Sequence, residues 1–359
     1  HPVAHSFPTR RSSDLNLHRE KKSWRGGPDE DNYYSFYAGR LDTGEDDICC
    51  DQDYRNVLGA IDLLRNRPAD QPFCIFLPLS KPHPPYGIED PWFSMIDRSA
   101  LPERIPAPEE GCEEPCLLSG IRNRQNMKGW SEERWAELRA TYYGMCARSD
   151  HQFGLLMNAL REEGLYDDTS VFVFSDHGDF TGDYGLVEET QHTFQDCLTR
   201  VPFLMKPPAW VSLQPGIREA MVELVDFSET VYDLTGIEPG YDRFGKSLLP
   251  LVAGETLEHR DAVFCEGGRR MGETQAMEHE SSSAHNPEEL YWPRVNLQTT
   301  DDAPYHSKAV MCRTAKYKYV LRLYESDELY DLDKDPGETE NRINDPACAE
   351  VISRLRTRA

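Results

Sequence analysis

Two short apolar runs on either side of a long amphipathic helix constrain the fold more than any other feature of the sequence. Residues 73–79 (FCIFLPL) and 170–174 (SVFVF) have the length and apolarity of buried strands. Between them, residues 131–163 place apolar side chains at helical spacing, with Ser131 as the predicted N-cap. Residues 201–205 predict a third strand. This order predicts an α/β fold with a mostly parallel central sheet flanked by helices.

Polar residues suited to ligand binding follow the first two predicted strands directly. The first strand leads into a proline-rich loop that contains His83, and the second leads into Asp176 and His177. Because ligands of such sheets bind beyond the carboxyl ends of the strands, we expect these residues to share one site. A carboxylate beside an imidazole can bind Ca²⁺ or Mg²⁺. The alternative is an Asp helix cap beside a surface His, which two residues alone would favour.

The sequence changes character after residue 245. Four short runs with partial alternation predict a small antiparallel sheet, at residues 262–265, 308–313, 317–323 and 328–332. Residues 347–356 predict a closing helix, and the polar residues 267–306 predict a loop. The C-terminal part is therefore expected to form an α+β subdomain.

The net charge of −24, from 39 Lys and Arg against 63 Asp and Glu, argues against nucleic acid and anionic membrane as partners. An anionic substrate would require positive charge gathered locally. The ten cysteines include no repeated CxxC pair, so a structural zinc site is not expected. Reduced thiols favour a cytoplasmic protein, with a periplasmic or secreted protein as the alternative.

Several motifs, in this order, resemble those of the type I sulfatases of the alkaline phosphatase superfamily. They are the Pro-His-x-Pro loop at 82–85, Asp-His-Gly at 176–178, Gly-Asp-x-Gly-Leu at 182–186, Arg-Val-Pro at 200–202 and the C-terminal pattern DELYDLDKDPGETENRI at 327–343. The resemblance runs from about residue 51 to the end of the chain. It implies the sulfatase-like α/β fold.

The resemblance also implies roles for individual residues. Asp176 and His177 would bind the metal, Ca²⁺ or Mg²⁺, and His83 would be the catalytic residue that contacts the sulfate. Glu189 stands where the family often has a sulfate-binding Lys, and a carboxylate there would weaken sulfate binding. Lys81 or Lys206 would compensate, or both are surface lysines.

The family's nucleophile is a formylglycine made from a Cys/Ser-x-Pro-x-Arg motif, and the only match in this sequence is at residues 6–10. That match lies within HSFPTRRSSDL at 5–15, which reads as a translated sequencing adapter, and we therefore reject it. We expect residues 1–15 to be non-native, 16–245 to be a partial sulfatase catalytic domain and 246–359 to be the C-terminal subdomain. A fragment truncated at its N-terminus in this way, with no nucleophile, is expected to be inactive by itself.

The function that the resemblance implies is hydrolysis of a small-molecule or glycan sulfate ester. One alternative is a phosphodiesterase or phosphonate monoesterase of the same superfamily, because sulfate and phosphate esters have similar shapes. Another is a non-catalytic sulfate- or glycan-binding pseudoenzyme, which Glu189 favours. The sequence leaves the oligomeric state open.

Overall fold

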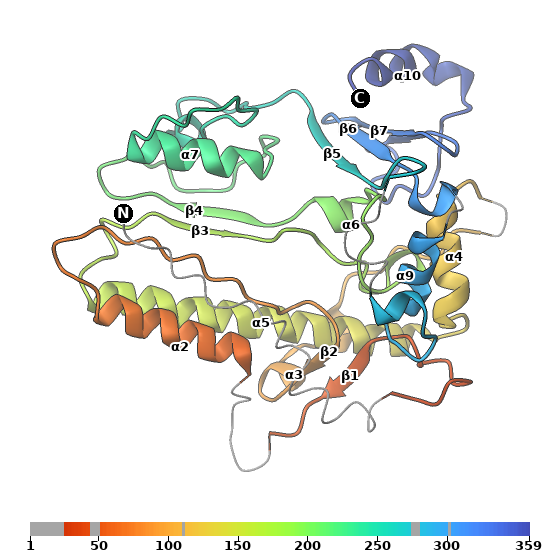
Figure 1. Ribbon diagram of the computed structural model, residues 1–359, viewed down its shortest axis with the longest axis horizontal. Coiled ribbons are helices and arrows are strands. Elements are labelled where there is room, and N and C mark those ends of the chain that lie inside the picture. Colours follow the sequence, from red (N-terminus) through yellow and green to blue (C-terminus); the bar gives the residue numbers. More distant parts are fainter. Residues whose placement is uncertain (1–24, 44–50, 110–111, 274–280, 301–302) are drawn as a thin grey trace. The chain divides into compact units, whose positions relative to one another are not determined.

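The computed structural model describes residues 25–43, 51–109, 112–273, 281–300 and 303–359 (Figure 1). The predicted non-native segment 1–15 lies outside them. The described residues divide into two compact units. Unit 1 contains the chain up to residue 106 together with 122–167 and 181–188, and unit 2 contains 107–121, 168–180 and 189–359. Helix α4 (Cys116–Gln125) has residues in both units.

Two helices that lie side by side dominate unit 1 (Figure 1). Helix α2 (Gln52–Arg65) begins where the Asp51 side chain accepts a hydrogen bond from the backbone N–H of Tyr54. Helix α5 (Glu132–Glu162) begins in the same way at Ser131, as the sequence predicts. Val57 and Ile61 of α2 pack with Ala159 of α5. Their 3.6-residue periodicity is what makes both helices predictable.

The rest of unit 1 consists of short elements. Strand β1 (Tyr37–Arg40) pairs in parallel with β2 (Tyr86–Ile88), whose three residues are buried. The other elements are α3 (Trp92–Met95) and the 3₁₀ turns η1 (Arg98–Ala100) and η2 (Asp183–Gly185).

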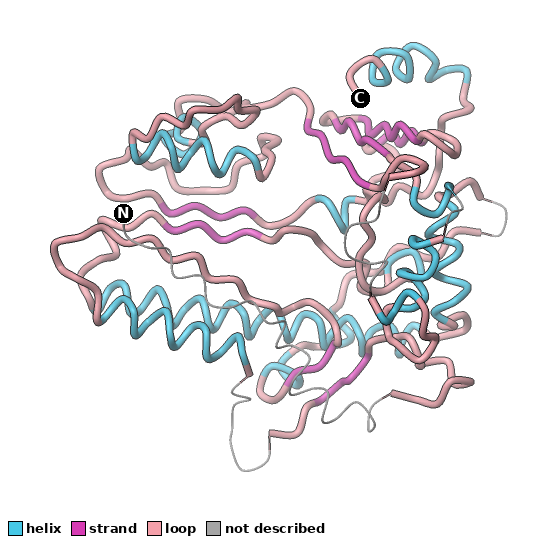
Figure 2. Tube along the Cα trace, viewed as in Figure 1, coloured by secondary structure: helices cyan, strands magenta, loops and turns pink. Residues whose placement is uncertain are grey.

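The prediction of a buried strand at residues 73–79 is wrong: the segment is drawn as loop in Figure 2. Its side chains still alternate. Leu77 and Leu79 pack against α2 and α5, whereas Phe76 is 76% exposed. The segment is therefore extended, but no other segment of the described chain forms a strand ladder with it. A strand requires such a partner as well as apolar residues.

Unit 2 contains the second predicted strand, β3 (Val171–Phe174), and the third, β4 (Phe203–Lys206). Both predictions are confirmed, but the two strands pair antiparallel, from Val171 opposite Lys206 to Phe174 opposite Phe203. The only helices between them are η2 and the four-residue α6 (Asp196–Thr199). Since no long crossover helix returns the chain, an antiparallel arrangement results. Among the described strands, the mostly parallel sheet is thus represented only by β1 and β2.

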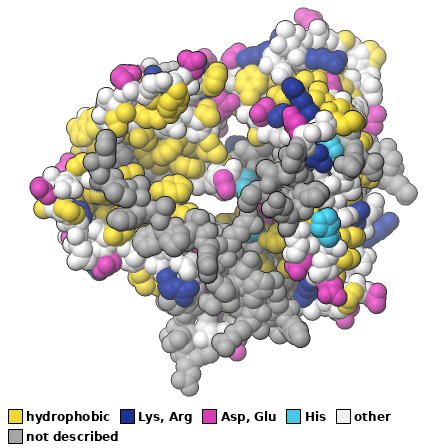
Figure 3. All heavy atoms as spheres, viewed as in Figure 1, with side chains coloured by type: hydrophobic (Ala, Val, Ile, Leu, Met, Phe, Trp, Pro, Cys, Tyr) yellow, Lys and Arg dark blue, Asp and Glu magenta, His cyan; other side chains and the backbone are white. Residues whose placement is uncertain are grey.

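Helix α7 (Val225–Thr235) covers this strand pair through Phe227, whose ring lies 5.0 Å from that of Phe172 and 5.1 Å from that of Phe174. On the face drawn in Figure 3, hydrophobic side chains gather over β3, β4 and α7. Leu204 of β4 is 54% exposed.

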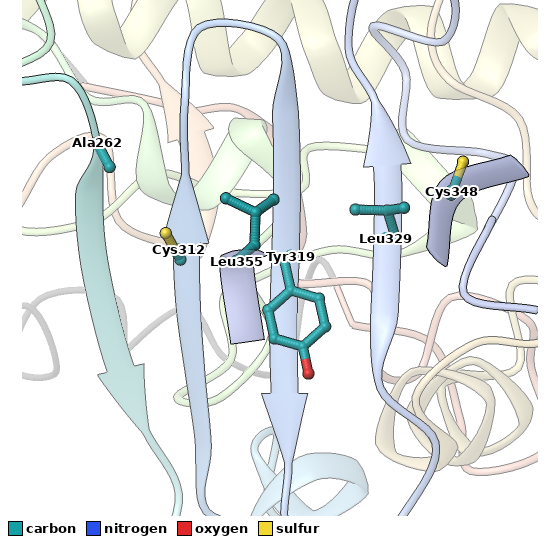
Figure 4. Packing of buried hydrophobic residues seen from close by; sticks show 6 residues of the cluster. All are labelled: Ala262, Cys312, Tyr319, Leu329, Cys348 and Leu355. Carbon is teal, nitrogen blue, oxygen red and sulfur yellow. The ribbon is translucent and has the colours of Figure 1, made fainter. Parts of the chain in front are cut away.

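The predicted C-terminal antiparallel sheet is confirmed. Its four strands lie in the order β5 (Val263–Gly267), β6 (Ala309–Arg313), β7 (Tyr317–Arg322) and β8 (Glu328–Asp331). The predicted closing helix is α10 (Ala349–Arg356), which follows the 3₁₀ turn η5 (Pro346–Cys348). Leu355 of α10 packs with Tyr319 and Leu329 of the sheet in a buried cluster (Figure 4).

The remaining elements of unit 2 are short. Helix α8 (Leu249–Ala253) precedes the sheet, and η3 (Ser282–Ala284), α9 (Trp292–Thr299) and η4 (Ala303–His306) lie within the polar stretch 267–306. The prediction of a loop for that whole stretch is therefore wrong, because Val295 and Leu297 give α9 a buried face. Within the described residues, none of the helices is both long and apolar enough to cross a bilayer.

Candidate metal and sulfate site

In unit 1, the His83 loop is fastened to helix α2 by one buried carboxylate. Asp53, which is 3% exposed, accepts hydrogen bonds from the backbone N–H groups of Ser80 at 3.0 Å and Lys81 at 2.8 Å. The backbone N–H of His83 then donates to the Ser80 carbonyl at 2.9 Å, which closes a turn. Asp53 therefore fixes the entry to the loop. The sequence alone does not reveal this role, since the only signal of Asp53 is its place in the first turn of a helix.

The imidazole of His83 is held in a defined orientation. Its Nδ1 lies 2.7 Å from the Pro84 carbonyl oxygen, so Nδ1 carries the proton that this contact requires. Lys81 donates from Nζ to the Gly87 carbonyl at 3.3 Å. A half-buried imidazole on a fastened loop suits a contact with an anion.

In unit 2, Asp176 and His177 follow β3 directly, as the sequence predicts. Their side chains are 88% and 42% exposed, and His177 Nε2 lies 3.9 Å from Asp176 Oδ1. His177 Nδ1 lies 2.9 Å from the Gly178 carbonyl oxygen, so Nδ1 carries the proton and Nε2 is the nitrogen suited to a metal. The two donor atoms are thus close enough to act on one cation.

The donor set fits a divalent cation only in part. Asp176 and His177 supply one oxygen and one nitrogen, whereas Ca²⁺ takes six to eight ligands. Among the side chains that the structure describes, no group of three or more His, Cys, Asp or Glu residues is placed to hold a metal. The pair can therefore contribute two ligands to a larger site.

Glu189 is half-buried in unit 2, and Lys206 donates from Nζ to the Thr169 carbonyl at 3.0 Å. Both Lys206 and Lys81 thus hold backbone carbonyls, which is a structural use of each amine. The predicted site residues are divided between the units, with His83 in unit 1 and Asp176, His177 and Glu189 in unit 2.

Comparison with models of protein families assigns the His83 loop and the end of β3 to one family. The model of the family described as Sulfatase matches residues 24–237, which include the His83 loop and the β3 end. The chain belongs to the sulfatase family. Sulfatases generally use a metal ion and a formylglycine and act on sulfate esters.

Curated relatives of this sulfatase chain have about one quarter of their aligned residues in common with it. The multifunctional alkaline phosphatase superfamily protein PehA of Trinickia caryophylli is 25% identical over 298 residues, which are 79% of this chain and 54% of that protein. Arylsulfatase K of Homo sapiens is 26% identical over 315 residues, which are 81% of this chain and 52% of that protein. The chain thus spans about half the length of the curated relatives it matches.

Solved structures support the same fold. The phosphonate monoester hydrolase of Agrobacterium radiobacter matches with a TM-score of 0.67 at 24% identity, over 86% of this chain and 59% of that one. The α/β fold class of the alkaline phosphatase and sulfatase type, with a small C-terminal antiparallel sheet, is thereby confirmed.

Proposed function

We propose that this chain is part of a metal-dependent sulfuric ester hydrolase in which Asp176 and His177 bind the cation and His83 contacts the sulfate. The observation that carries the proposal is the match of the sulfatase family to one continuous range, 24–237, that includes all three residues. The further metal ligands and the formylglycine nucleophile would come from sequence that this chain does not contain.

Each residue would have a distinct task. Asp176 Oδ and His177 Nε2 would hold Ca²⁺ or Mg²⁺, which supplies positive charge beside the sulfuryl oxygens when it is bound. When both of its ring nitrogens carry a proton, His83 would donate from Nε2 to a sulfuryl oxygen while its Nδ1–H remains on the Pro84 carbonyl. Because the chain carries a net charge of −24, such local positive charge is what an anionic ester requires.

Two alternatives have support of their own. A phosphonate monoesterase or phosphodiesterase is favoured by the similarity to the phosphonate monoester hydrolase structure and to PehA. A non-catalytic protein that binds a sulfated small molecule or glycan is favoured by Glu189, because a carboxylate at that position repels sulfate.

The decisive experiment is to recover the uninterrupted gene and assay its product on an aryl sulfate, a phosphodiester and a phosphonate monoester. We expect kcat/KM to be highest for the sulfate ester. Asp176→Asn and His83→Gln should each lower it by about 100-fold or more, because each removes charge stabilisation from the reacting group. Asp168→Asn and His151→Gln are matched controls at exposed positions and should change it little.

Three outcomes would contradict the proposal. A phosphorus ester as the best substrate would establish the first alternative, and binding of sulfate without turnover would establish the second. Turnover of the aryl sulfate by the 359-residue chain itself would show that the nucleophile lies within it.

A further inference from the structure

The backbone directly after the candidate metal pair is fastened to α6. The N–H of Gly178 donates to the Leu198 carbonyl at 2.7 Å, and the N–H of Asp179 donates to the Cys197 carbonyl at 3.1 Å. An added Cβ at Gly178 would lie 1.9 Å from the Cys197 oxygen, so the approach is too close for any other residue. The position of His177 therefore depends on the position of α6.

Helix α6 has only four residues and cannot stabilise itself. Its first residue, Asp196, is held by groups from the C-terminal sheet and the segment after it. Lys318 of β7 donates to Asp196 Oδ1 at 2.6 Å, and Arg313 of β6 donates to both carboxylate oxygens at 3.1 and 2.9 Å. The N–H of Asp196 donates to Glu338 Oε2 at 2.6 Å.

These four side chains form a network of two cations and two carboxylates, in which Lys318 and Glu338 are buried and Arg313 and Asp196 are partly exposed. Lys318 and Glu338 form an ion pair in which each side chain is 1% exposed, and Lys318 Nζ also donates to the Phe194 carbonyl at 2.7 Å. Burial raises the pKa of the Asp196 carboxyl, but Lys318 and Arg313 outweigh burial and hold that pKa below its ordinary value. Each of the two carboxylates therefore lies beside at least one cation, which is the condition under which charged groups can be buried.

Glu338 belongs to the C-terminal pattern at 327–343, to which the proposed function assigns no task. A turn presents it: the Asp335 carboxylate accepts the N–H groups of Thr339 at 2.7 Å and Glu340 at 2.8 Å, and the N–H of Glu338 donates to the Asp335 carbonyl at 3.1 Å. Glu338 itself adopts a left-handed conformation with φ of 52°. The turn thus directs its carboxylate to residues about 140 positions earlier in the sequence.

We propose that Glu338 and Lys318 are positioning residues for the metal-binding pair: through Asp196 and α6, the C-terminal pattern fixes the backbone that carries Asp176 and His177. The inference rests on the proposed function, because it takes these two residues as metal ligands. In this proposal, the C-terminal sheet holds the backbone of the metal-binding pair in place, in addition to packing its own core.

The test uses the product of the uninterrupted gene, which would supply the further metal ligands, with labelled histidine and with CaCl₂ as the probe. Two quantities are measured: the Ca²⁺ concentration at the midpoint of the change in the His177 imidazole signal, and the hydrogen-exchange rates of the Gly178 and Asp179 amides. Loss of residues that orient metal ligands costs about 10- to 100-fold in affinity, and Glu338 acts one step further away, so we expect Glu338→Ala to raise the midpoint about tenfold. Both amides should exchange faster. Glu338→Gln keeps an acceptor for the Asp196 N–H and should recover most of both effects.

Arg260→Met is the matched control, because Arg260 also forms a buried ion pair in unit 2, with Asp226 near the start of α7. It should destabilise the chain but leave the midpoint and the two amides unchanged. If Glu338→Ala altered both readouts no more than Arg260→Met, the positioning role would be overturned. If the wild-type His177 signal did not respond to Ca²⁺, the proposed function would fail, and the exchange rates would still decide whether Glu338 positions this backbone.

Discussion

The two sheets of unit 2, β3–β4 and β5–β8, differ in how deeply their side chains are buried. Every residue of β3 is only partly buried, and Leu204 of β4 is exposed. All four residues of β8 are buried, and β6 and β7 contribute Cys312 and Tyr319 at 0% exposure. The strand pair that leads into Asp176 and His177 therefore gains less stability from the burial of its own side chains than the C-terminal sheet does.

This difference separates stability from function. The C-terminal sheet closes its core with α10 and needs no ligand for that. The β3–β4 pair has α7 on one side, and its functional end is fastened through α6 to the network around Lys318. The geometry of the candidate site is thus expected to follow the stability of the other sheet.

The largest effect is expected from Lys318→Met. The change leaves the buried Glu338 carboxylate without its cation and leaves Asp196 with Arg313 alone, which should lower the free energy of unfolding by about 3–5 kcal/mol. Urea denaturation measures it. Lys316→Met, at an exposed ion pair just before the same strand, is the control and should have little effect. Equal losses from both variants would show that the buried network is not a source of stability.

A second variant pair compares the sheets directly. Leu329→Ala removes a fully buried side chain of β8 and should cost about 3 kcal/mol, because a cavity remains. Leu204→Ala removes a side chain that is 54% exposed and should cost about 0.5 kcal/mol. Denaturation curves for the two variants test the contrast. A cost at Leu204 as large as that at Leu329 would mean that the β3–β4 face is covered in solution.

What the sequence could predict follows this same division. The helices at 52–65 and 132–162 and the four C-terminal strands were predictable because their periodicity is local. The antiparallel pairing of β3 with β4 and the missing partner of residues 73–79 were not, since pairing depends on chain segments far away. Apolar runs show that a segment is extended but not what lies beside it.

The candidate site shows the same limit. The place of Asp176 and His177 at the end of a strand was predictable because they directly follow an apolar run, and their role as metal ligands stays a prediction. The residues that hold such loops in place were not: Asp53 lies 27 positions before Ser80, and Glu338 lies 142 positions after Asp196. The sequence places Glu338 within a pattern that resembles the family's C-terminal motif. Only the structure shows that its carboxylate accepts the N–H of Asp196 at the start of α6.

A third prediction concerns acid. Burial lowers the pKa of His192 to about 3, and its carbonyl accepts from Arg322 of the C-terminal sheet. The unfolded chain therefore binds one more proton than the folded chain between about pH 3 and 6.5, so this residue's contribution is complete above pH 6.5 and is lost as the pH falls. Stability should drop by about 1.4 kcal/mol per pH unit from this residue alone. His192→Gln should remove that slope in denaturation curves taken at pH 6.5, 5.5 and 4.5; an unchanged slope would show that His192 is protonated in the folded state.

The smallest effect is expected from metal, and it bears most directly on the contrast between the sheets. In the product of the uninterrupted gene, Ca²⁺ at about ten times its dissociation constant should stabilise the folded state by about 1.4 kcal/mol, since only that state holds the donor atoms of Asp176 and His177 in a fixed geometry. Hydrogen exchange should show the added protection at the end of β3 and at α6, with much less in β5–β8. Asp176→Asn should abolish it and Asp168→Asn should not. Protection spread evenly over both sheets, or retained in Asp176→Asn, would mean that Ca²⁺ binds elsewhere and that the end of β3 is not where the metal acts.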